Sequence, residues 1–159
     1  MRKIKTFGLL IIFVLFSACG YKSIYTEDRG SFKINEIKFE GDQALNNITN
    51  KRFQKYFLPI NLQSNIEIKE FSLNINSSSA RNILTRSSTG KVGMFELIIT
   101  LDVKTFSDGE LLLEKSFSAK NVYNNESNKF ALSQYEKIIK KELLNKLIDE
   151  IINYINNIK

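Results

Sequence analysis

The chain has 159 residues, which is enough for one domain with a hydrophobic core and too few to favour two. It carries 23 basic and 17 acidic residues, one cysteine and no histidine, so it excludes serine–histidine triads, cysteine–histidine dyads and histidine-ligated zinc. Because the acidic residues follow no catalytic motif and no glycine-rich phosphate loop is present, we expect no enzyme, no metal site and no cofactor.

The first 18 residues have the three parts of a secretory signal peptide. Residues 2–5 supply three basic side chains, residues 7–16 form an apolar stretch, and Ser17 and Ala18 supply the small side chains that precede a cleavage site. Crossing a bilayer takes about 20 apolar residues, so this stretch is too short to be a transmembrane helix. We therefore predict that residues 1–18 are removed.

Cys19 follows these small side chains directly. The run LFSACG, residues 15–20, resembles the lipobox of bacterial lipoproteins, with Phe16 where leucine is usual. The resemblance implies a mature chain that begins at Cys19 and carries covalent acyl chains there, and several acyl chains anchor a protein durably. Gly20 in place of aspartate implies sorting to the outer membrane. The alternative is a secreted protein with a free thiol, since a single cysteine forms no internal disulfide.

The rest of the chain is expected to form a lipidated tether, residues 19–30, and one α+β domain, residues 31–159. Removing the three basic residues of the signal peptide leaves 20 basic against 17 acidic residues, a net charge of +3. These charges are scattered along the chain rather than gathered in blocks. The mature protein is therefore not expected to bind nucleic acid.

The domain begins with a strand and a helix. Apolar residues alternate over residues 32–39 and change phase near Asn35 and Glu36, which predicts a strand with a β-bulge. Three- and four-residue spacing over residues 45–57 predicts an amphipathic helix, ended by Pro59. Alternation resumes in a second strand, residues 66–75.

A hairpin and a long helix follow. Residues 95–103 alternate strictly, Asp108-Gly109 suits a type I′ turn, and the return strand runs over residues 111–122. An apolar face that includes Phe130, Tyr135 and Ile138 predicts one helix over residues 130–158, roughly 45 Å long. The predicted fold is a two-layer α+β sandwich of order β-α-β-β-β-α, with two helices on one face of a four-stranded, mainly antiparallel or mixed sheet.

The mature start resembles that of a known family. Residues 19–25, CGYKSIY, are similar to the Cys-Gly-aromatic-x-Pro-Leu-Tyr opening of the lipopolysaccharide-assembly lipoproteins, the LptE family, with Ser23 and Ile24 in place of Pro and Leu. The length and the order of elements also agree with that family's two helices on a four-stranded sheet. The resemblance implies an outer-membrane lipoprotein that plugs the LptD β-barrel, assists its assembly and helps deliver lipopolysaccharide. The alternative is an accessory lipoprotein of a pilus, secretion or barrel-assembly complex.

Three basic residues are the candidate ligand-binding side chains. Arg81, Arg86 and Lys91 flank a stretch rich in serine, threonine and asparagine, residues 82–90, which we expect to be a loop. Basic side chains on a loop can pair with the phosphates of lipid A, and the LptE resemblance implies lipopolysaccharide binding in this region. The alternative is an ordinary solvated loop.

Overall fold

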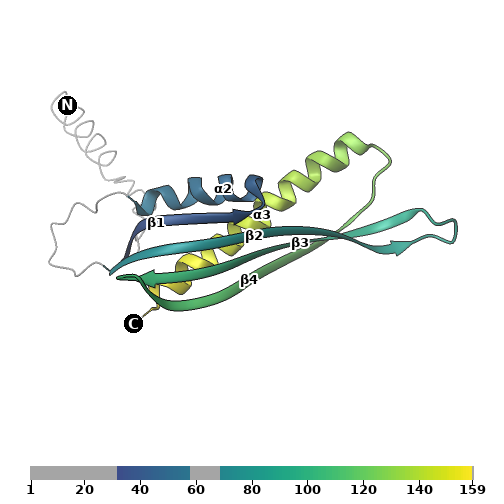
Figure 1. Ribbon diagram of the computed structural model, residues 1–159. Coiled ribbons are helices and arrows are strands. Elements are labelled where there is room, and N and C mark those ends of the chain that lie inside the picture. The colour runs from purple at the N-terminus through teal and green to yellow at the C-terminus, as the bar shows by residue number, and fades with distance from the viewer. Residues whose placement is uncertain (1–31, 58–68, 159) are drawn as a thin grey trace, which may run out of the picture.

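A computed structural model describes residues 32–57 and 69–158. In chain order they form strand β1 (Phe32–Gly41), helix α2 (Gln43–Phe53), the short 3-10 helix η1 (Gln54–Tyr56), strands β2 (Lys69–Arg86), β3 (Val92–Ser107) and β4 (Glu110–Asn124), and helix α3 (Lys129–Asn156) (Figure 1). The predictions for Cys19, for the tether and for Pro59 lie outside the described residues.

The strands form one mixed sheet in the order β1-β2-β3-β4, in which β1 is parallel to β2 and the other neighbours are antiparallel. Helix α2 packs on β1 and β2, and α3 packs on β3 and β4 and against α2 (Figure 1). An ion pair of 2.6 Å joins Arg52 of α2 to Asp149 of α3. The predicted two-layer α+β fold and its element order are confirmed. None of the described helices is long and apolar enough to cross a membrane.

The hydrophobic core lies between the helices and one face of the sheet. Both the helices and the sheet contribute fully buried side chains, which include Ile34, Leu45, Phe53, Leu73, Ile75, Leu97, Ile99, Leu101, Ile139, Leu144, Leu147 and Ile148. The opposite face of the sheet carries polar residues such as Asn76, Thr100 and Asp102, which alternate with the buried ones. This alternation is why one face binds the helices and the other faces water.

Two local predictions about the strands are confirmed. Ile34 pairs with Phe71 and Glu36 pairs with Ser72, so Asn35 is the extra residue of a β-bulge, and the phase of β1 changes where the sequence pattern changes. At the hairpin between β3 and β4, Asp108 and Gly109 have φ values of 50° and 84°. Both are positive, as the type I′ turn requires.

The predicted loop at residues 82–90 is wrong for residues 82–86 and confirmed for residues 87–90. Strand β2 continues to Arg86, paired with β3 as far as Val92, and only residues 87–91 form the turn. This part of β2 has little apolar alternation because most of its side chains are exposed, and its backbone is held by hydrogen bonds to β3. Backbone pairing to β3, whose apolar residues alternate clearly, therefore extends β2 over residues whose own side chains do not predict a strand.

Helix α3 also differs from the prediction at its N-terminal half. Phe130, Tyr135 and Ile138, which we expected on the buried face, are 73%, 46% and 55% exposed. The buried side chains there are Leu132 and Ile139, on the other side of the helix. The N-cap of α3 is regular, since the Asn128 side chain accepts hydrogen bonds from the Phe130 and Ala131 amides.

Candidate functional site

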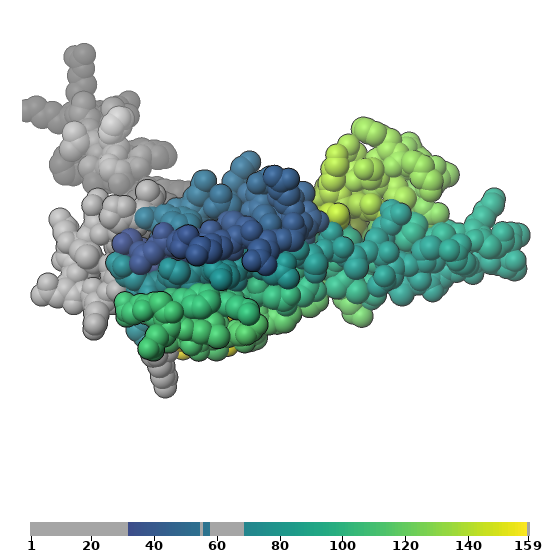
Figure 2. Space-filling model, viewed as in Figure 1, coloured from purple at the N-terminus to yellow at the C-terminus, as the bar shows by residue number. Residues whose placement is uncertain are grey.

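The hairpin formed by β2 and β3, with its turn at residues 87–91, extends beyond the ends of β1 and β4. Pairing between β1 and β2 stops at Gly41 and Ser77, and pairing between β3 and β4 stops at Met94 and Asn124. The sheet therefore narrows from four strands to three and then to a two-stranded hairpin. The first half of α3 lies over this region (Figure 2). We call residues 80–98 and 120–141 the distal end.

Arg81 joins the distal hairpin to α3. Its Nη1 atom donates a hydrogen bond of 2.8 Å to Oε1 of Glu136, in an ion pair, and its guanidinium lies 4.5 Å from the centre of the Phe95 ring. The Tyr123 hydroxyl donates a second hydrogen bond, 2.7 Å long, to the same Glu136 oxygen. Strands β2 and β4 are thus both bonded to one carboxylate on α3, and Arg81 serves first as a brace between layers.

The three groups shift one another's pKa values. Partial burial acts to raise the pKa of Glu136, but the hydrogen bonds from Tyr123 and Arg81 and the Arg81 charge outweigh burial, so the pKa is lowered. The hydrogen bond to Glu136 raises the pKa of Arg81. Burial, followed by the bond to Glu136, raises the pKa of Tyr123 to about 12. At neutral pH the site therefore holds a charged pair and a neutral phenol.

Replacing Glu136 with glutamine should destabilise the domain more at neutral pH than in acid. A lowered pKa in the folded state gives stability that is present above the unfolded value and lost as the pH falls below about 4.5. We expect Glu136→Gln to cost about 1 kcal/mol at pH 7, since Arg81 is half exposed and screened by solvent. Melting curves at pH 7 and pH 3 measure this. An equal difference from wild type at both pH values would show that the ionised carboxylate contributes nothing.

Arg86 and Lys91 flank the tip of the hairpin and are both exposed. Arg86 donates a hydrogen bond of 3.1 Å to the Gly90 carbonyl, and Gly90 has a φ of 78° that favours glycine. The turn is closed by the bond of 2.8 Å from the Ser87 amide to the Lys91 carbonyl. Neither cation forms an ion pair with another described residue. Of the three predicted ligand residues, these two therefore share the tip, and Arg81 lies apart from them.

Several surface hollows among the described residues are large enough for a small ligand. One, of about 300 Å³, lies beside the brace and is lined by Ser79, Arg81, Leu97, Glu136 and Lys140. Its two basic residues, Arg81 and Lys140, lie beside the Glu136 carboxylate, which is already bonded to Arg81. No local sequence pattern predicts the contact between Arg81 and Glu136, because the two residues are 55 positions apart in the chain.

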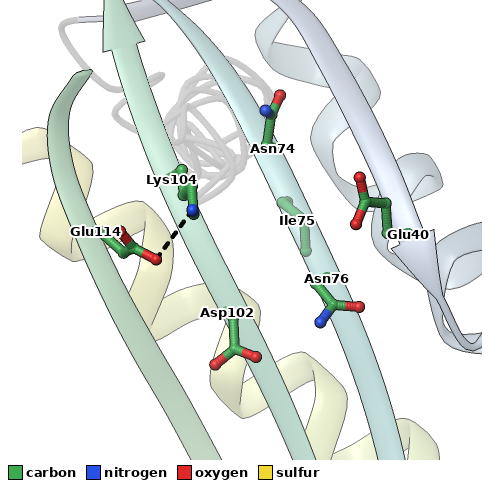
Figure 3. Close-up of a pocket in the computed structure, with 7 residues that line it drawn as sticks. All are labelled: Glu40, Asn74, Ile75, Asn76, Asp102, Lys104 and Glu114. Carbon is green, nitrogen blue, oxygen red and sulfur yellow. Dashed lines mark ion pairs between the residues drawn. The ribbon is translucent and has the colours of Figure 1, made fainter.

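The second hollow lies on the helix-free face of the sheet and measures about 360 Å³. Figure 3 shows Asn74, Asn76, Asp102, Lys104 and Glu114 on three neighbouring strands, with Lys104 and Glu114 paired at 3.2 Å. Within the described ranges, no group of acidic residues is placed to hold a metal ion. This face is therefore a polar, solvated surface, and the distal end is the stronger candidate for binding.

No family model matches the sequence, and no curated protein matches it significantly. Its structure is similar to rare lipoprotein B of Shewanella oneidensis, with a TM-score of 0.57 and 18% identity over 76% of this chain and 93% of that one. Lipoprotein B of Nitrosomonas europaea gives a TM-score of 0.60 at 12% identity, over 79% and 85%. A minor lipoprotein of Acinetobacter baumannii gives a TM-score of 0.56 at 13% identity, over 78% of this chain and 90% of that one. At these identities the likeness shows a shared fold.

Proposed function

We propose that this chain is an outer-membrane lipoprotein of the LptE type, which plugs an LptD-like β-barrel, assists its assembly and helps lipopolysaccharide reach the outer leaflet. The observation that carries the proposal is the fold shared with rare lipoprotein B over 93% of that chain. It agrees with the predicted signal peptide, with Cys19 and with the mature start at residues 19–25. The work proposed is binding rather than catalysis.

The shape of the domain supports a role inside a barrel. Strands β2 and β3 have 18 and 16 residues, and at about 3.3 Å per residue they are roughly 50–60 Å long. A bilayer with its headgroups is about 40–45 Å thick. A narrow sheet of this length can extend through a barrel that crosses the membrane.

Arg86 and Lys91 are the residues that we propose for contact with lipid A phosphates. They are exposed, close together at the tip and free of ion pairs with described residues. Arg81, the third residue predicted to bind lipid A, is left out of this proposal because it already forms an ion pair with Glu136.

Reversing both charges should weaken lipopolysaccharide binding. We expect Arg86→Glu with Lys91→Glu to lower the affinity about tenfold at low salt, since two attractive contacts become repulsive. Binding of purified lipopolysaccharide measures this, with circular dichroism to check folding. The matched control is Lys38→Glu with Lys51→Glu, the same change of charge at exposed positions on β1 and α2. If the double variant folds and binds lipopolysaccharide as tightly as wild type, Arg86 and Lys91 do not contact the ligand and are ordinary solvated side chains.

A further inference from the structure

The charges of the described residues are unevenly distributed along the molecule. The distal end contains eight basic residues and three acidic ones, whereas the other described residues contain nine basic and eleven acidic ones. One end is therefore strongly positive and the other slightly negative. The positive end is also the end at which the hairpin and the first half of α3 project (Figure 2).

Exposed apolar side chains gather at the same end. Of the eight large hydrophobic side chains that are exposed among the described residues, six belong to the distal end: Ile83, Leu84, Val122, Phe130, Tyr135 and Ile138. Phe130 is the most exposed of them, at 73%. Three of them, Phe130, Tyr135 and Ile138, belong to α3, and exposed apolar side chains grouped on one element indicate a surface that is covered in use.

The outward face of α3 mixes the two kinds of side chain. Phe130, Lys137, Ile138 and Lys141 lie within about 100° of one another around the helix at 3.6 residues per turn. Lys137 and Lys141 are exposed and make no ion pair or hydrogen bond with another described residue. In helices that lie in the interface of an anionic membrane, lysines bind the phosphates while phenylalanine and leucine side chains enter the interface.

We infer that the distal end docks on the surface of a phospholipid bilayer that contains anionic headgroups, with Phe130 and Ile138 entering the interface and Lys137 and Lys141 at the level of the phosphates. Lysines interleaved with the apolar chains argue against a protein partner, because lysine is depleted in protein interfaces. At a bilayer, long lysine side chains keep their charge in water while the stem lies among apolar groups.

The predicted lipid anchor would make such a contact easier. Residues 19–31 reach at most about 45 Å, so an acylated Cys19 holds the start of β1 near a membrane. A tethered domain meets that membrane at a high effective concentration, so a weak second contact is enough to lay the domain along the surface. The inference concerns the free lipoprotein and does not depend on a barrel partner.

The chain contains no tryptophan, which allows a direct test. Phe130→Trp in the mature lipidated protein places a single reporter at the proposed contact, and Leu112→Trp places one at an exposed position outside the distal end. Both proteins are incorporated into vesicles of phosphatidylcholine, with or without phosphatidylglycerol. Tryptophan emission and quenching by brominated lipid are then measured.

We expect the residue-130 reporter to shift to shorter wavelength, and to be quenched at least about twofold more, only in the anionic vesicles and only at low salt. The residue-112 reporter lies at the anchored end of the sheet, so it should give the same signal with and without phosphatidylglycerol. Adding Lys137→Gln and Lys141→Gln to Phe130→Trp should abolish the shift.

Equal behaviour in both vesicles, or an equal response at residue 112, would overturn the inference. So would a response that needs lipopolysaccharide or an added β-barrel protein, although either of these would support the proposed function. Loss of barrel binding in cells, by contrast, would contradict the proposed function and leave the vesicle result unaffected.

Discussion

Replacing Cys19 with alanine is expected to leave an uncleaved precursor that carries no acyl chains. The sulfur is the atom to which the lipid would be attached, and in lipoproteins cleavage follows that attachment. The reason to expect it is the signal-peptide pattern before Cys19, in a chain that has no second cysteine. Intact mass of the membrane fraction measures both events, and the expected loss of the mature acylated form is complete.

The matched control for this variant is Ser23→Ala, a change of similar size four residues further on, which should be processed like wild type. Circular dichroism should show the same α+β domain in both variants, because Cys19 precedes the first described strand by 13 residues. If the wild-type protein starts elsewhere, or carries no acyl mass, the lipoprotein assignment is wrong.

Depleting the protein should lower the amount of correctly assembled LptD-like barrel and make the envelope permeable. A plug that binds only the folded barrel stabilises it by mass action, so its loss shifts the barrel toward unassembled forms. The measurement is the level of heat-modifiable, folded barrel on gels, together with sensitivity to large antibiotics. A normal barrel level combined with a defect in a pilus or secretion system would favour the accessory-lipoprotein alternative.

The parts of the fold that were predicted correctly are those in which local sequence carries the determining interaction. The phase change at Asn35 marks the β-bulge because side chains on either side must still reach the core. Asp108-Gly109 marks the hairpin turn because the required positive φ values favour these residues. Both signals are contained within a few positions of the chain.

The distal end was predicted poorly because its structure depends on partners far away in the chain. Strand β2 is held past Ser77 by backbone pairing to β3, which no side-chain pattern of its own reveals. Arg81 meets Glu136 only when α3 lies across the hairpin.

Apolar spacing on α3 placed Phe130 and Ile138 on a helix, but it could not show which side of that helix the sheet covers. Positions at which a structure departs from its local sequence pattern are often functional, and Phe130 and Ile138 are the residues proposed to contact the membrane.

The most direct test of the proposed function is affinity purification of the mature lipoprotein from solubilised envelopes, followed by identification of the proteins that accompany it. We expect a large β-barrel of the LptD type in near-equal amount. The Arg86→Glu and Lys91→Glu double variant should still bind this barrel, because the two residues are proposed to contact lipid A rather than the barrel. Recovery of a different envelope complex, with no such barrel, would contradict the proposed function.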